Sequence, residues 1–240
     1  MENISEPTPI AGQSGTSSSG LEKGLLSPLT FGLVGCSAIG AFLFTGTYLI
    51  EGITRPGYDA WQQAISTLSL GPGGWVQQVN FVFFGLLTLL SVFGWYRLLT
   101  PGRASIWFPL FQSFAGLGLI GAGIFPPDPL PGYPPGVVPT APTLHGTIHT
   151  VCAFAIILFL ACGCLVLARR FAVESSWRGW AVYSVITGVL ILVFFMLFVA
   201  YSTAPAAGLV ERVSAGSHAL WSCLLLVALF FQKRGQRVQT

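Results

Sequence analysis

Six long stretches of this chain are almost free of charged residues, and this feature limits its possible folds more than any other. Each stretch has about 20 residues, which is the length a helix needs to cross the hydrocarbon core of a bilayer. Only 8% of all residues are charged, whereas soluble proteins average about 25%. We therefore predict an all-α, polytopic membrane protein with six transmembrane helices. The predicted spans are 29–52, 79–99, 104–125, 144–168, 180–201 and 213–231.

The segment between the first two spans is too polar to cross a membrane. Within it, Trp61, Ile65 and Leu68 recur at the spacing of one helical face. Asp59, followed three residues later by Gln62, fits a capping box at a helix start, and tryptophan is a common anchor at the membrane interface. The sequence therefore predicts one short amphipathic helix that lies in the interface between spans 1 and 2.

The two ends of the chain differ in composition from the spans. Residues 1–28 are rich in Ser, Gly, Thr and Pro and contain few apolar side chains. A segment of this kind cannot bury enough surface to offset the entropy lost on ordering. We predict a disordered cytoplasmic tail at 1–28, a six-helix membrane domain at 29–231 and a basic cytoplasmic tail at 232–240.

Basic residues are divided unevenly between the two sides of the predicted membrane domain. With six spans, both termini lie on one side, and the loops of the other side hold only Arg55 and Arg212. Cytoplasmic loops carry an excess of Lys and Arg, so we predict that both termini are cytoplasmic. These residues flank spans in the ordinary way, and we expect no nucleic-acid partner. The terminal side holds nine basic residues, namely Lys23, Arg97, Arg103, Arg169, Arg170, Arg178, Lys233, Arg234 and Arg237.

The loop at 126–143 joins spans 3 and 4 and contains eight prolines in eighteen residues. Proline fixes the φ angle, so a loop this rich in proline is stiff and extended. Loops of this length without secondary structure are usually functional or disordered. Because the loop also carries Tyr133, Val137 and Val138, we predict that it packs down as a lid.

Three histidines fall at the predicted outer ends of spans. His145 and His149 lie one helical turn apart on one face of span 4, the spacing by which one helix gives two imidazoles to a metal ion. His218 lies at a similar depth in span 6 and would join them if spans 4 and 6 were neighbours. With three imidazole nitrogens as ligands, we expect Asp128 to add a carboxylate oxygen as the fourth ligand, and zinc is the candidate cofactor. The alternative is a structural cluster in which Asp128 and the histidines hold the lid by hydrogen bonds.

Ser66 lies on the predicted interfacial helix, on the same side as these residues. Together, Ser66, Asp128 and the three histidines are similar in type to the active site of the alkaline ceramidase and adiponectin-receptor group of membrane hydrolases. In that group, zinc activates water against a lipid amide. This chain departs from the group in having six spans and in carrying its H-x-x-x-H at span 4. The analogy implies Ser66 and Asp128 as candidate catalytic residues, and no G-x-S-x-G motif accompanies Ser66.

Five further charged residues belong to the same outer side. Glu51 ends span 1, and Glu211 and Arg212 precede span 6, while Arg55 and Asp59 lie in the first outer loop. We predict a structural role for all five, with a Glu51–Arg212 or Glu211–Arg55 ion pair tying the loops together.

Several strings in these loops resemble a known bacterial membrane family. They are EGITRPGYDAWQQAISTLSLGPGGWVQQVNF, GIFPPDPLPGYPPG with LHGTIH, and GLVERV followed by Trp221. The family is the one called domain of unknown function 998, and the resemblance covers about residues 30–232. It implies a six-helix protein of a bacterial-type plasma membrane and carries no established activity.

Three classes of function remain open from the sequence. The first is a metal-dependent hydrolase that acts on a lipid or small amphiphile in a lidded polar pocket at the extracytoplasmic face. The second is a non-catalytic binding or scaffold protein that recognises a lipid headgroup or a partner. The third is a small-molecule carrier, although the deepest polar side chains of the spans are all neutral. In each case the lipid bilayer is a partner, with a lipid or small molecule as the expected ligand.

Overall fold

The computed structural model describes residues 27–139 and 141–238, and six long helices account for most of them. All six are long and apolar enough to cross a membrane, which confirms the predicted all-α, six-span fold. Two short 3-10 helices lie between them, η1 (Ile65–Ser69) and η2 (Ser175–Trp177). The long helices are α2 (Pro28–Thr54), α3 (Trp75–Leu99), α4 (Ala104–Ile124), α5 (Leu144–Ala172), α6 (Arg178–Ala200) and α7 (Ala207–Val238).

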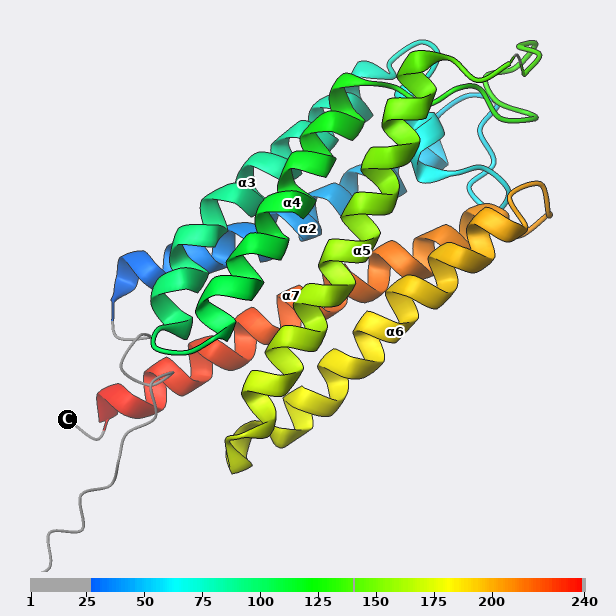
Figure 1. The fold of residues 1–240 in the computed structure, drawn as a ribbon. Helices are drawn as coiled ribbons and strands as arrows, with labels where there is room; N and C mark the ends of the chain where they lie inside the picture. The colour runs from blue at the N-terminus through cyan, green and yellow to red at the C-terminus, as the bar shows by residue number, and fades with distance from the viewer. Residues whose placement is uncertain (1–26, 140, 239–240) are drawn as a thin grey trace, which may run out of the picture.

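The six long helices form a closed ring in chain order (Figure 1). Each helix packs against the next one, and α2 packs against α7 to close the ring. Consequently α6 lies between α5 and α7, so the predicted spans 4 and 6 are not direct ring neighbours. Their inner faces nevertheless look onto the same central space, which brings residues of distant segments together.

Glycines allow the closest helix approaches in the ring. At Gly85 of α3, an added Cβ would lie 2.7 Å from the carbonyl oxygen of Gly116 in α4. At Gly94 of α3, it would lie 2.6 Å from the backbone nitrogen of Val34 in α2. No hydrophobic driving force acts between helices inside a membrane. Small residues at such contacts therefore let the helices approach closely and gain van der Waals packing.

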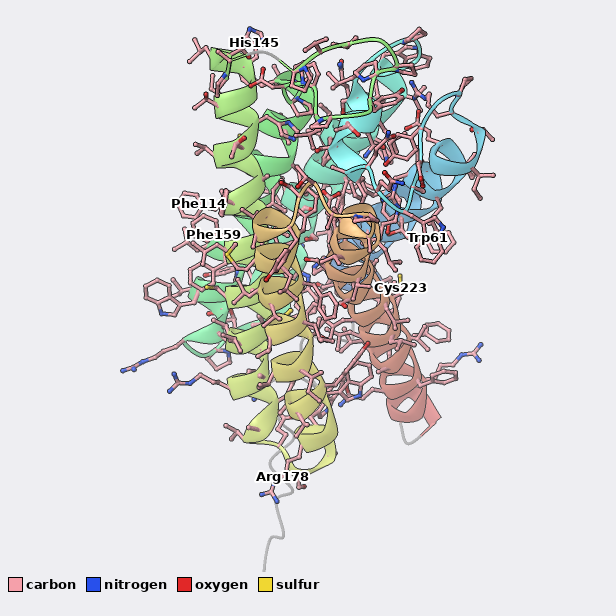
Figure 2. All side chains as sticks on the ribbon, turned by 90° about the vertical axis from the view of Figure 1, so that its right-hand side faces the viewer. Trp61, Phe114, His145, Phe159, Arg178 and Cys223 are labelled. Atoms are coloured by element: carbon pink, nitrogen blue, oxygen red, sulfur yellow. The ribbon has the colours of Figure 1, made fainter. Side chains whose placement is uncertain are left out.

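The bundle has two chemically different ends. One end, here called the lid end, carries the loop 126–143, and His145 lies there, whereas Arg178 lies at the opposite end (Figure 2). That opposite end also carries Arg97, Arg103, Arg169 and Arg170, which makes it the basic end. The predicted cytoplasmic orientation of the basic end stays a prediction. Residues 1–26 of the predicted tail lie outside the described residues, and α7 continues through 232–238.

The segment between α2 and α3 differs in detail from its prediction. Its only helix is η1, a five-residue 3-10 helix, instead of a longer amphipathic α-helix that includes Trp61. Ile65 and Leu68 are buried as expected, but Trp61 is 64% exposed and projects from the surface (Figure 2). An exposed tryptophan at the end of a membrane bundle fits an interfacial anchor. The turn at Trp61 lies against α7, since the N–H of Leu209 donates to the carbonyl oxygen of Trp61 at 3.1 Å.

The lid loop packs down through its tyrosine. Tyr133 is 1% exposed, and its ring meets the ring of Tyr58 edge-on at a centroid distance of 5.2 Å. The Gln63 side chain donates to the carbonyl oxygen of Gly132 at 3.0 Å. The prediction of a packed lid was wrong for Val137 and Val138, which are exposed at 44% and 76%. An aromatic side chain and backbone contacts therefore help to hold the loop, whereas Val137 and Val138 form no buried patch.

Candidate functional site

A cavity lies at the lid end, and its lining comes from α3, α4, α5, α6, η1 and the lid loop. Its volume is about 550 Å³, within the usual range for small-molecule sites. Ser66, Asp128 and His149 are among the polar residues of its lining. Phe154 and Phe198 are among the apolar ones. Figures 1 and 2 both show α5 extending beyond the end of α6 here, which leaves this side of α5 open.

Asp128 is fixed at the N-terminus of α5 by one residue. Its Oδ2 accepts from the backbone N–H of Thr143 at 3.0 Å, and its Oδ1 accepts from the Thr143 hydroxyl at 2.6 Å. Thr143 in turn caps α5, because its Oγ1 accepts from the N–H of Gly146. The hydroxyl bond, followed by the backbone bond, lowers the pKa of the Asp128 carboxyl below its ordinary value. Asp128 is therefore an ionised group that ties the lid loop to α5.

His149 is buried, and its hydrogen bonds identify its tautomer. Nδ1 lies 2.8 Å from the carbonyl oxygen of Phe125 and 3.1 Å from that of Ala122. Both partners can only accept, so Nδ1 must carry the proton. In the neutral ring, Nε2 is then left with a lone pair, and no partner for it is found within residues 27–139 and 141–238. His149 thus adds a hydrogen-bond acceptor to the cavity lining.

The other two histidines do not join His149. His145 is exposed and lies against the ring of Phe125 at 5.4 Å. His218 is buried inside the ring, with Nε2 at 3.4 Å from Ser222 Oγ. Among the described residues, no group of three or more His, Cys, Asp or Glu side chains could hold a metal ion. The expected convergence on zinc is not found, because His149 packs against Phe81 of α3, His218 packs against Phe84 about one turn further along, and His145 lies exposed at the end of α5.

A second, smaller cavity of about 90 Å³ lies on the ring axis. It is lined almost entirely by apolar side chains, with His218 as its titratable group. All six long helices contribute, through residues such as Phe44, Phe84, Leu119, Ile157, Ile191 and Ala219. The two cavities share four lining residues, namely Phe81, Ala153, Ile156 and Phe195. The central cavity therefore adjoins the lid-end cavity.

The charged residues at the lid end have different partners from those predicted. Glu51 pairs with Arg55, four residues on, and Arg55 also donates to the carbonyl oxygen of Gly73 at 3.0 Å. Glu211 accepts from the backbone N–H of Ile65 at 2.6 Å. The predicted Glu51–Arg212 and Glu211–Arg55 pairs were wrong. Arg55 and Glu211 still connect loops to helices, and they do so through backbone groups of the loops.

Arg212 fastens α7 to the loop between α2 and η1. Its guanidinium donates to the carbonyl oxygens of Gln63 at 3.0 Å and Gly208 at 2.9 Å. It also donates to the hydroxyl of Tyr58 at 2.6 Å. Burial raises the pKa of Tyr58 to about 12, although the adjacent cation acts in the opposite direction. Tyr58 is therefore a neutral hydroxyl that both receives from Arg212 and donates to Gln63 and Ala64 carbonyl oxygens.

Three residues of this region were missed in the sequence, namely Tyr58, Gln63 and Thr143. Asp59 does form a pattern like the predicted capping box. Its Oδ1 accepts from the N–H of Trp61 at 2.9 Å, and its own N–H donates to the side-chain oxygen of Gln63, instead of Gln62, at 2.9 Å. Thr143 carried a usable signal, since a threonine directly before an apolar span is a favoured N-cap. The roles of Tyr58 and Gln63 depend on tertiary contacts and carried no such signal.

The chain was compared with protein families, with curated proteins and with solved structures. No curated protein and no solved structure gave a significant match. One family model, described as "Protein of unknown function (DUF998)", matches residues 38–228, which include nearly all of the helical ring and both cavities. The resemblance drawn from the loop sequences is thereby confirmed, and the chain belongs to the DUF998 family of membrane proteins.

Proposed function

We propose that this protein binds a membrane amphiphile in the two adjoining cavities. The polar head lies beside Ser66, Asp128 and His149, and the chain points toward the central cavity. The observation that carries this proposal is the composition of the lid-end cavity, which joins these polar groups to a lining of phenylalanines. Ligand sites in proteins commonly combine a mostly apolar lining with a few placed polar groups.

The central cavity supports a chain-binding role. Protein interiors are packed about as densely as organic crystals, and large apolar voids are unusual because their lining loses van der Waals contacts. A void lined by all six helices and next to a larger cavity has room for the end of an apolar chain. A cavity of about 150 Å³ binds a benzene molecule, so 90 Å³ suits a few methylene groups.

The rim of the lid-end cavity supports access from the bilayer. Val151 of α5 and Val199 of α6 line the cavity and are also 64% and 42% exposed on the outside of the bundle. These exposed apolar side chains give a lipid chain an entry route between the ends of the two helices. With the predicted orientation, this is the extracytoplasmic leaflet.

A hydrolytic function at the same polar groups is the second candidate, because Ser66, Asp128 and His149 line one cavity. In this structure Asp128 bonds to Thr143, and Nδ1 of His149 bonds to backbone carbonyls. The carboxylate therefore does not orient the imidazole as a catalytic triad requires. Release of a fatty acid or amine from a bound lipid, lost in Ser66→Ala, would favour this candidate over binding alone.

The proposed binding is tested by filling the junction of the two cavities. Replacing Ala153 with phenylalanine places a ring where both linings meet. We expect the variant to bind a fluorescent single-chain amphiphile about tenfold more weakly in lipid nanodiscs, since the chain loses its space. The melting temperature in lipid-free detergent, measured alongside, shows that the variant is folded.

Leu158→Phe is the matched control. Leu158 lies on the same helix, is 49% exposed and belongs to neither cavity lining. This variant is expected to bind the amphiphile as the unmodified protein does. Equal binding by the Ala153→Phe and Leu158→Phe proteins would contradict the proposed site.

A further inference from the structure

The lid-end cavity offers hydrogen-bond acceptors and few donors. The Thr147 hydroxyl donates to the carbonyl oxygen of Thr143 at 2.8 Å, and the Thr150 hydroxyl donates to that of Gly146 at 2.9 Å. These protons are used inside α5, so both oxygens can offer only lone pairs to a ligand. The proton of the neutral His149 ring is likewise used on backbone carbonyls. Among the side chains of the described lining residues, the hydroxyl groups of Ser66 and Ser202 remain able to donate.

The same cavity contains a carboxylate and, within the described part of the chain, no lysine or arginine in its lining. The two arginines of the lid end are occupied elsewhere. Arg55 pairs with Glu51, and Arg212 donates to Tyr58 and to the backbone of Gln63. An anionic head in this cavity would meet the carboxylate of Asp128 without a neighbouring cation to compensate it.

The N-terminus of α5 does not offer an alternative anion site. Helix N-termini attract anions through their free N–H groups and the helix dipole. Here Asp128 and Thr143 already fill this position, since Asp128 accepts from the N–H of Thr143 and Thr143 accepts from that of Gly146. The positive end of the helix is therefore matched by the protein's own carboxylate.

We propose that the ligand is a single-chain amphiphile whose head donates hydrogen bonds and bears no phosphate or carboxylate. An ammonium or a hydroxyl head meets this requirement, and an ammonium gains in addition from the carboxylate of Asp128. This inference rests on the proposed binding function and narrows it to one chemical class. It assigns Asp128 and His149 as the groups that select the head.

The test is a competition experiment in nanodiscs of zwitterionic phospholipid. A monoacylglycerol with a photoreactive chain is crosslinked to the protein, and the crosslinked peptides are mapped by mass spectrometry. The unlabelled competitors have matched chains and are an alkylamine, a monoacylglycerol, a fatty acid and a lysophosphatidic acid. We expect crosslinks at Phe154, Phe195 or Phe198, and competition by the amine and the glycerol about tenfold stronger than by either anion.

Three variants separate head selection from folding. Asp128→Asn is expected to lower the affinity for the alkylamine about tenfold and to leave monoacylglycerol binding within about twofold. Thr143→Val removes the hydroxyl that donates to Asp128 but keeps the charge, so the preference for the amine is expected to persist. Asp59→Asn changes a carboxylate of the lid end outside the cavity lining and is expected to bind as the unmodified protein does.

The possible results of these experiments test the head selection, the role of Asp128 and the binding function separately. Anionic competitors that displace the probe as well as the amine does would overturn the head selection and leave the binding site standing. Equal loss of amine preference in Asp128→Asn and Thr143→Val would show that Asp128 acts only by holding the lid. The absence of any competable crosslink in the cavity lining would overturn the proposed binding function itself.

Discussion

Replacing Arg212 with alanine is expected to lower the free energy of unfolding by about 3 to 5 kcal/mol. The guanidinium donates two hydrogen bonds that join α7 to the loop before η1, to Gln63 and to Tyr58, and a third to Gly208 within α7. Hydrogen bonds to charged groups contribute about 1.5–3 kcal/mol each, and the loss is not fully additive. The change also leaves the Gln63 carbonyl oxygen with one partner fewer in a half-buried place. The measurement is the unfolding midpoint in detergent, followed by helical circular dichroism.

Two further variants show whether the hydrogen-bond geometry or the charge matters. Arg212→Lys keeps the charge but cannot reach three partners at once, so it is expected to recover less than half of the lost stability. Arg178→Ala removes an exposed arginine at the basic end and is expected to change stability by about 0.5 kcal/mol or less. If Arg212→Ala lowered the stability as little as Arg178→Ala, the hydrogen bonds of Arg212 would not hold α7 to the loop before η1 as proposed.

Replacing Gly85 with leucine is expected to destabilise the bundle by about 3 kcal/mol or more. Even a Cβ at this position would lie 2.7 Å from both the carbonyl oxygen of Gly116 and Cγ1 of Ile120. The backbone atom cannot move aside, so α3 and α4 must separate and lose packing along their length. The unfolding midpoint in detergent again measures the effect.

Gly46→Leu is the matched control for this prediction. Gly46 also lies within a membrane-spanning helix, α2, but an added Cβ there meets no atom within 4 Å. Its replacement is expected to be neutral or slightly stabilising, since leucine favours the helix. Similar unfolding midpoints for Gly85→Leu and Gly46→Leu would contradict the close approach of α3 and α4.

The spans could be predicted because a helix that crosses a bilayer needs a long, apolar stretch of sequence. A charge-free stretch of about 20 residues has few other stable conformations in a bilayer. The boundaries were less accurate, as α3 begins at Trp75 and α5 ends at Ala172, several residues beyond the predicted spans. Polar residues can continue a helix outside the hydrocarbon core, and charge content alone does not mark where such a helix ends.

The end of the bundle at which three candidate residues gather was predictable, but their contacts were not, and the function of the site stays a prediction. Ser66, Asp128 and His149 do line one cavity, as their shared membrane side indicated. His145 lies one turn closer to the end of α5 than His149 on the same face, so His145 is exposed while neighbouring helices bury His149. The Glu51–Arg55 pair was within reach of sequence reasoning, because opposite charges four residues apart on a helix commonly interact. The bond from Arg212 to the carbonyl oxygen of Gln63 was not, since Gln63 lies in a loop far along the chain.

The opening between the ends of α5 and α6 has a consequence for how the proposed ligand reaches its site. In the proposed binding mode the exposed rim, with Val151 and Val199, lies at the lid end, so the ligand would exchange with the leaflet at that end. Occupancy then follows the mole fraction of the amphiphile in that leaflet, and the aqueous concentration hardly matters. A lipid moved to the opposite leaflet no longer fills the cavity, although its total amount is unchanged. The bound fraction of the protein would thus report the transbilayer asymmetry of its ligand.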